Sequence, residues 1–204
     1  MKSQRFSALL QDDVIFAHKQ ILPTDDKEKL SAEITRLRLR ILELERHADT
    51  DPLVPVYNRR AFMREISRAQ SVRKRYDIIS SVIFIDLNDF RSVNDRFGHA
   101  IGDALLQRIG EMLLTSVRDC DMVARLGGDA FGILLFKASQ DIARAKASAL
   151  TCRIAEQFID MPTMRVQTSA SWGVAPCDAD DTPEQVLDRA DRSMSVLRAQ
   201  ENLV

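Results

Sequence analysis

The sequence predicts an α/β domain preceded by a helical segment, and three observations support this prediction. The chain has 204 residues, of which 45% are hydrophobic and 29% charged, enough for one sizeable core and a modest extension. Residues 1–50 show only helical periodicity. From residue 51 onward, short apolar runs alternate with amphipathic stretches, as in a sheet flanked by helices. We therefore divide the chain into a helical segment, residues 1–50, and a sheet domain, residues 51–204.

The helical segment is expected to contain two helices. Apolar residues at helical spacing predict the first over residues 3–22, and Pro23 interrupts the pattern. Thr24 and the acids after it can cap a second helix that runs to about residue 49. Apolar residues in that helix alternate steps of four and three, the rhythm of a coiled-coil seam: Leu30, Ile34, Leu37, Ile41, Leu44 and Ala48. We favour a dimerising stalk; the alternative is an amphipathic helix packed on its own domain or on the first helix.

The elements of the sheet domain follow from changes in hydrophobic period. Two apolar strands flank Gly127-Gly128-Asp129, and a short glycine-containing link of this kind is typical of a β-hairpin. The expected order is helix 58–75, strand 78–86, helices 88–97 and 99–117, strands 121–126 and 130–137, helix 140–159, strand 164–175 and helix 182–200.

Charge and composition exclude several function classes. With 29 basic and 30 acidic side chains, no global field favours nucleic acid or an anionic membrane, so we expect no DNA or RNA partner. The three widely spaced cysteines fit neither a disulfide framework nor a thiolate metal site. No apolar run approaches the roughly 20 residues that cross a bilayer. The chain is therefore expected to be cytoplasmic, without a membrane span.

Two carboxylates point to a local site for an anion and a metal. Asp86 ends the apolar strand 78–86, where a lone carboxylate is often only a helix cap. If that strand lies beside the hairpin, Asp86 and Asp129 converge, and two carboxylates suit a hard cation that carries phosphates. Gly127 and Gly128 lack side chains, so their backbone can approach phosphate oxygens closely.

Five segments, spanning nearly all of residues 51–200 in order, resemble the GGDEF domain of diguanylate cyclases: DPLVPVYNRRAF (51–62), FIDLNDFRSVNDRFGHAIGDALL (84–106), RDCDMVARLGGDAFGILL (118–135), SASWGVA (169–175) and RADRSM (189–194). The resemblance implies a central, mostly antiparallel sheet flanked by helices, similar to adenylyl cyclases and polymerase palms. It also implies a reaction that joins two GTP molecules into cyclic di-GMP with loss of pyrophosphate.

The resemblance also implies roles for individual residues. Asp86, the Leu87 carbonyl and Asp129 fall on the positions that bind Mg²⁺ (or Mn²⁺), and Asp129 is the catalytic carboxylate that remains. Asn94 and Asp103 fall on the pair of positions that recognises guanine. These residue types suit that role, since a carboxylate can accept from both N1–H and the exocyclic amine. Phosphate-facing positions are held by Arg91, Arg198, Gly127 and Gly128.

A second site is implied by Arg118 and Asp121, which match the RxxD product-inhibition motif at its fixed distance from the hairpin. An isolated RxxD is frequent by chance and is usually a solvated pair. At this distance from the hairpin it predicts an allosteric site for cyclic di-GMP, because arginine can bind a guanine edge or a phosphate with two hydrogen bonds.

The sequence departs from the family at Ala130, where the signature normally has a glutamate of the metal site. A methyl group cannot coordinate magnesium or orient a nucleophile. Val54-Pro55-Val56 replaces Thr-Gly-Leu, and Glu201-Asn202 stands where a Gly-Arg pair often contacts phosphate. We therefore expect a homodimeric, catalytically impaired protein that binds GTP or cyclic di-GMP and signals to a protein partner. The alternatives are an active diguanylate cyclase and a structural dimerisation module.

Overall fold

The computed structural model describes residues 24–161 and 164–201, and the predicted helix 3–22 lies outside them. The chain divides into two units, residues 1–48 and 49–204. In the first unit, helix α2 (Thr24–Asp49) has 26 residues, in agreement with the expected second helix. Among the described helices, none combines the length and the apolar character needed to cross a membrane.

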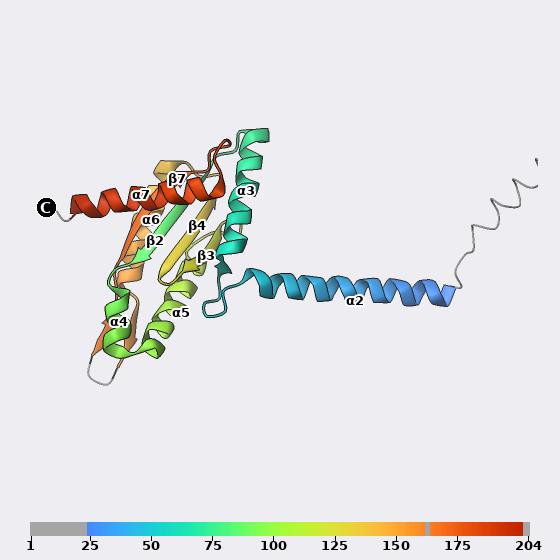
Figure 1. The fold of residues 1–204 in the computed structure, drawn as a ribbon, viewed down its shortest axis with the longest axis horizontal. Coiled ribbons are helices and arrows are strands. Elements are labelled where there is room, and N and C mark those ends of the chain that lie inside the picture. The colour runs from blue at the N-terminus through green and yellow to red at the C-terminus, as the bar shows by residue number, and fades with distance from the viewer. Residues whose placement is uncertain (1–23, 162–163, 202–204) are drawn as a thin grey trace, which may run out of the picture. The chain divides into compact units, whose positions relative to one another are not determined.

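The second unit is a five-stranded sheet covered by helices on both faces (Figure 1). The strands lie in the order β1-β3-β4-β2-β7, and β1 pairs parallel with β3 while every other pair is antiparallel. The predicted α/β class with a mostly antiparallel sheet is therefore confirmed. The strands are β1 (Tyr57–Asn58), β2 (Ser80–Leu87), β3 (Met122–Gly127), β4 (Ala130–Phe136) and β7 (Ala170–Pro176).

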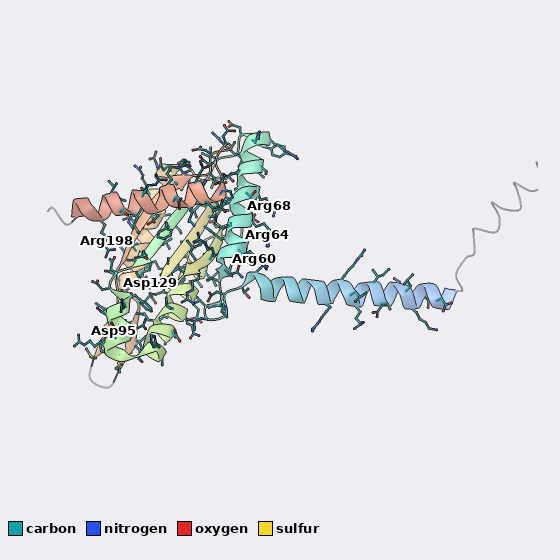
Figure 2. The ribbon with its side chains drawn as sticks, viewed as in Figure 1. Arg60, Arg64, Arg68, Asp95, Asp129 and Arg198 are labelled. Carbon is teal, nitrogen blue, oxygen red and sulfur yellow. The ribbon has the colours of Figure 1, made fainter. Side chains whose placement is uncertain are left out.

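Helices α3 (Arg59–Tyr76) and α7 (Pro183–Glu201) cover one face of the sheet, and α5 (His99–Thr115) and α6 (Gln140–Ala155) cover the other. The short helix α4 (Phe90–Phe97) packs on α5. Helix α3 carries three arginines one turn apart, Arg60, Arg64 and Arg68 (Figure 2), and the first two pair with the Asp49 carboxylate at 3.2 and 2.6 Å.

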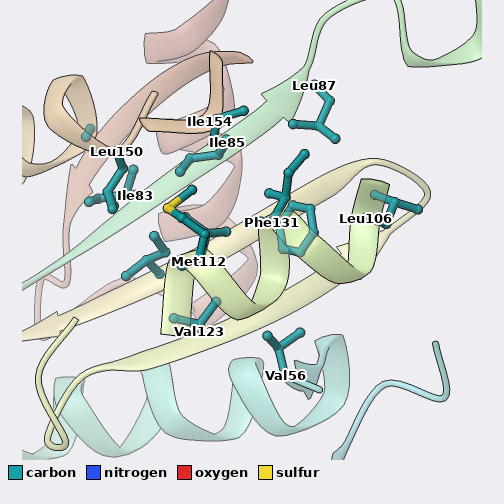
Figure 3. Close-up of a cluster of buried hydrophobic side chains, with 14 of the residues drawn as sticks. Val56, Ile83, Ile85, Leu87, Leu106, Met112, Val123, Phe131, Leu150 and Ile154 are labelled. Atoms are coloured by element: carbon teal, nitrogen blue, oxygen red, sulfur yellow. The ribbon is translucent and has the colours of Figure 1, made fainter. Parts of the chain in front are cut away.

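The core has two layers because β2 is buried on both faces. Ile83, Ile85 and Leu87 point into the cluster beneath α5 and α6 (Figure 3), whereas Val82 packs with residues of α3 and α7 on the opposite face. A strand that is buried on both faces is expected to have a nearly continuous apolar sequence. The run SSVIFIDL has this composition.

Two predicted elements differ from the structure. The predicted helix 140–159 ends at Ala155, and strand β5 (Phe158–Asp160) follows it. The predicted strand 164–175 is two strands, because β6 (Arg165–Gln167) pairs with β5 in a separate two-stranded sheet and β7 pairs with β2.

Candidate functional site

The two predicted carboxylates lie beside each other at one end of the central strands. Strands β2 and β4 pair with Asp86 opposite Ala130, so Asp129 is one residue from the register partner of Asp86. The Leu87 amide donates a hydrogen bond of 3.4 Å to the Asp129 carbonyl. The sheet therefore brings together the end of β2 and the turn of the hairpin, as the sequence predicted.

The environment of Asp86 disfavours the negatively charged form of its own carboxyl group. Burial raises the pKa of the Asp86 carboxyl above its ordinary value, and the Asp129 carboxylate raises it further. Arg198 opposes this shift, while Asp191, a carboxylate on α7 that the sequence did not single out, adds to it. Partly buried carboxylates that repel each other in this way are stabilised by a bound cation.

The donor set at this edge suits a hard cation that brings oxygen ligands of its own. Asp86 and Asp129 provide carboxylates, and the Leu87 carbonyl belongs to the same strand end. No group of three or more His, Cys, Asp or Glu side chains among the described residues is arranged to hold a metal ion. Since Mg²⁺ is usually bound by one or two carboxylates together with phosphates and water, two carboxylates could hold the cation, whatever further group its chemistry requires.

The hairpin turn has a backbone conformation that glycine permits. Gly127 and Gly128 have φ angles of +140° and +55°, a region in which side chains are strained. Both glycines are exposed, so their backbone is accessible to a ligand. The Gly128 carbonyl accepts hydrogen bonds from Arg125 Nε at 2.9 Å and Nη2 at 2.7 Å. The turn is thus held by a side chain of the preceding strand.

Five of the predicted residues line one cleft of about 530 Å³: Arg91, Asn94, Asp103, Gly128 and Asp129. Helix α4 supplies Arg91 and Asn94, helix α5 supplies Asp103, and the hairpin supplies the other two. Phe90, Asp95, His99, Leu106 and Arg125 complete the lining. A volume in this range is typical of small-molecule sites.

Three arginine and glycine positions of the predicted phosphate site differ in their access to this cleft. Gly127 is in the same turn as Gly128 but does not line the cleft, and Arg198 acts on Asp86 from α7. Arg91 is 94% exposed and lies 3.7 Å from Asp95, a separation too long for a strong ion pair. Its guanidinium is therefore accessible to an anion in the cleft.

The position of Asn94 depends on the absence of a side chain at residue 102. A Cβ atom at Gly102 would lie 2.0 Å from Asn94 Oδ1 and 3.1 Å from Phe90 Cζ. Gly102 thus lets helix α4 pack closely against α5, which places the Asn94 amide and the Asp103 carboxylate in one cleft. The sequence analysis did not identify this requirement.

Arg118 and Asp121 lie together at the start of β3, at a small pocket of about 60 Å³ that Lys146 also lines. The Asp121 carboxylate accepts hydrogen bonds from the amides of Arg118 at 3.1 Å and Phe136 at 3.0 Å. Asp121 therefore shapes the turn, whereas the exposed Arg118 side chain has no hydrogen-bond or ion-pair partner among the residues that the structure describes.

Besides Asp191 and Asp95, the sequence reasoning missed a buried ion pair of the site, Arg125 with Asp51. Arg125 Nη1 lies 3.2 Å from Asp51 Oδ1, and the two side chains are only 15% and 14% exposed. The available signal was an arginine in the apolar strand VARLG, because a charge buried in a sheet requires a partner. The partner could not be assigned, because Asp51 lies 74 residues earlier.

Comparison with known proteins is consistent with this geometry. Residues 48–202 match the family model described as diguanylate cyclase, GGDEF domain. The chain is 34% identical over 185 residues to the diguanylate cyclase TpbB of Pseudomonas aeruginosa (strain UCBPP-PA14), covering 85% of this chain and 40% of TpbB. It is 30% identical over 164 residues to the probable diguanylate cyclase DgcE of Escherichia coli (strain K12), covering 78% of this chain and 14% of DgcE. The chain thus spans less than half the length of these relatives.

Solved structures share the fold. The coiled coil and GGDEF domain of DgcB from Caulobacter crescentus, solved with c-di-GMP, superposes with a TM-score of 0.76 at 21% identity, covering 87% of this chain and 94% of that one. The GGDEF domain of TpbB from Pseudomonas aeruginosa gives a TM-score of 0.67 at 34% identity, covering 74% and 89%. The matched family model, the identity to these relatives and the shared architecture together establish that the chain belongs to the GGDEF domain family of diguanylate cyclases.

Proposed function

We propose that the chain is a catalytically impaired GGDEF protein that binds GTP, cyclic di-GMP or both and passes this state to a partner. One observation supports the proposal above all. Asn94, Asp103, Gly128 and Asp129 line a single cleft, whereas Ala130, opposite Asp86, offers no metal ligand at the same strand end. Groups suited to binding a guanine nucleotide are present, and one group needed for turnover is missing.

Each part of the cleft has a chemical role in this proposal. Asn94 and Asp103 would hydrogen-bond the guanine edge, and the exposed Arg91 would pair with phosphates. The Gly127–Gly128 turn would admit the phosphates close to the backbone. Asp86, Asp129 and the Leu87 carbonyl would hold Mg²⁺ or Mn²⁺, which would offset charge on the triphosphate.

The second proposed ligand is cyclic di-GMP at Arg118. Its guanidinium is exposed at the pocket formed with Asp121 and Lys146. The DgcB structure of the same fold was solved in complex with c-di-GMP. A guanidinium without a partner is suited to a guanine edge or a phosphate, because it offers two parallel hydrogen bonds.

An active diguanylate cyclase is the second candidate function. Several relatives are described as diguanylate cyclases, and Asp86 and Asp129 lie together in this chain. Titration calorimetry with GTP and with cyclic di-GMP, together with a turnover assay, separates the candidates. Binding without turnover supports the sensor, turnover supports the cyclase, and no binding of either nucleotide would leave a structural dimerisation module.

We expect Gly102→Ala to weaken GTP binding by roughly two- to ten-fold, the equivalent of one hydrogen bond. The added methyl group would lie 2.0 Å from Asn94 Oδ1 and must displace the amide from its place beside Asp103. Calorimetry measures the change, and Ala100→Ser on the exposed surface of the same helix is the control. Unchanged GTP affinity in Gly102→Ala would mean that Asn94 does not read the base.

We expect α2 to make the protein a parallel homodimer. Leu30, Ile34 and Leu37 are 53, 41 and 48% exposed, an apolar stripe that a second copy would cover. Light scattering should report a dimer for the full chain and a monomer after removal of residues 1–50. Ile34→Glu with Leu37→Glu should also give a monomer, while Thr35→Glu, at an exposed position away from the seam, should not. A dimer of unchanged affinity without residues 1–50 would show that the stalk is not the interface.

A further inference from the structure

We propose that Arg125 and Asp51 are positioning residues that couple the segment where the chain enters the domain to the turn of the nucleotide-binding hairpin. This inference rests on the proposed nucleotide binding at the cleft and extends it to regulation. Occupancy of the cleft and the conformation of residues 51–54 would then be linked, so that each influences the other.

The hairpin side of this link is a guanidinium bound to one carbonyl. Arg125 donates from Nε and Nη2 to the Gly128 carbonyl at 2.9 and 2.7 Å, and from Nη1 to Asp51 Oδ1 at 3.2 Å. A guanidinium is planar, so three bonds to two partners fix the partners relative to each other. With the two side chains 15% and 14% exposed, solvent competes little for these bonds.

The other side of the link is a compact turn. Asp51 Oδ1 also accepts hydrogen bonds from the amides of Leu53 at 3.0 Å and Val54 at 2.9 Å, and the Asp51 amide donates to the Val56 carbonyl at 2.9 Å. Val54 and Val56 are 1% and 2% exposed and belong to the core. The segment therefore cannot move without changing the position of the Asp51 carboxylate.

The same segment is the covalent connection to the N-terminal helix. Asp49 is the last residue of α2 and the first of the domain unit, and Asp51 follows two residues later. Hydrogen bonds thus lead from the Gly128 carbonyl through Arg125 to Asp51, which lies two residues after the end of α2. A nucleotide that reorients the Gly127–Gly128 turn would bias the segment, and by reciprocity the segment would alter nucleotide affinity.

The test uses NMR spectroscopy of the full chain and two variants that break the link differently. Asp51→Asn keeps an oxygen that can accept from Leu53 and Val54 but removes the charge that pairs with Arg125. Arg125→Lys keeps a positive charge but loses the planar fork. Arg189→Lys is the matched control, because Arg189 also bridges a carbonyl, that of Pro176 at 2.7 Å, and a carboxylate, that of Asp181 at 2.6 Å, without lining the cleft.

The first measurement needs no nucleotide. Backbone order parameters of residues 127–129 should fall from about 0.85 to below about 0.6 in Arg125→Lys and stay unchanged in Arg189→Lys. A hairpin turn equally ordered in Arg125→Lys and the wild type overturns the proposal.

The second measurement adds GTP. In the wild type, GTP should shift the amide resonances of Leu53 and Val54, which do not line the cleft. In Asp51→Asn, whose amide oxygen can still accept from Arg125 but without the ion pair, this response should become smaller while Asn94 and Asp103 still respond, and GTP affinity should fall. If GTP binds the wild type without affecting Leu53 and Val54, the coupling is wrong. If GTP does not bind the wild type, the proposed GTP binding at the cleft fails, and the order parameters alone decide whether Arg125 positions the turn.

Discussion

Incubation of the chain with GTP and magnesium is expected to yield little cyclic di-GMP, with a turnover well below the roughly 1 per second at the low end of ordinary enzymes. The reason is Ala130, which lies opposite Asp86 in the register of β2 and β4. A carboxylate at this position would be a further ligand for the cation that offsets charge on the triphosphate and the attacking oxygen, whereas a methyl group can neither coordinate the cation nor orient the nucleophile. Chromatography of the incubation measures the product.

Two substitutions at the same position separate charge from size. Ala130→Glu restores the missing carboxylate and is expected to raise product formation, whereas Ala130→Gln has the same shape without the charge and is not. An active relative such as TpbB, 34% identical to this chain, provides the positive control. A wild-type turnover near 1 per second would contradict the prediction and favour the active cyclase.

The juxtaposition of Asp86 and Asp129 could be predicted because its signals are local. Asp86 ends a continuous apolar run, and Asp129 follows two glycines between two apolar strands. If strand 78–86 pairs antiparallel with the second strand of the hairpin, the end of the former meets the start of the latter at one edge of the sheet. Asp86 and Asp129 must then lie close together. The observed pairing of β2 with β4 has this register.

The second half of the domain was predicted less well because long-range contacts override periodicity there. Phe158 and Ile159 continue the apolar spacing of α6, but the Phe158 ring centroid lies 5.5 Å from the Arg108 guanidinium and 4.3 Å from that of Arg165. Cation–π contacts of this kind hold the residue in β5, outside the helix. A local pattern has no information about an arginine 50 residues earlier on α5.

The link between Asp51 and Arg125 shows the same limit within the site. In the sequence alone, Asp51 is an ordinary turn carboxylate and Arg125 an ordinary strand arginine. The structure shows that they pair, because the two side chains are only 14% and 15% exposed and an unpaired charge at such a site is costly. Family motifs predicted which residues would contact a nucleotide, whereas the residues that position them became visible only in three dimensions.

Cyclic di-GMP is expected to bind the protein through Arg118 even though turnover is weak, because the two sites use different side chains. The cleft is lined by residues of α4, α5 and the hairpin turn, and the Arg118 pocket by residues at the start of β3, the end of β4 and α6. Ala130 adjoins Asp129 of the cleft and does not line the Arg118 pocket, so the lack of a carboxylate at position 130 leaves the Arg118 side chain and the Asp121 turn in place.

Arg118→Ala should therefore reduce affinity for cyclic di-GMP by roughly ten- to hundred-fold, the equivalent of a charge-assisted contact of about 1.5–3 kcal/mol, while GTP affinity stays nearly unchanged. The substitution should leave the turn that Asp121 closes intact, because Arg118 contributes its backbone amide to that turn and not its side chain. Asp121→Ala would be ambiguous, since it also leaves the Phe136 amide without its acceptor. Arg144→Ala, an exposed arginine on α6 that does not line the pocket, is the matched control and should bind normally. Titration calorimetry of the wild type and both variants measures these affinities. Two outcomes would remove Arg118 from the proposal: no heat of binding from the wild type at high micromolar cyclic di-GMP, or equal affinities in the wild type and Arg118→Ala. GTP would then be the ligand to pursue.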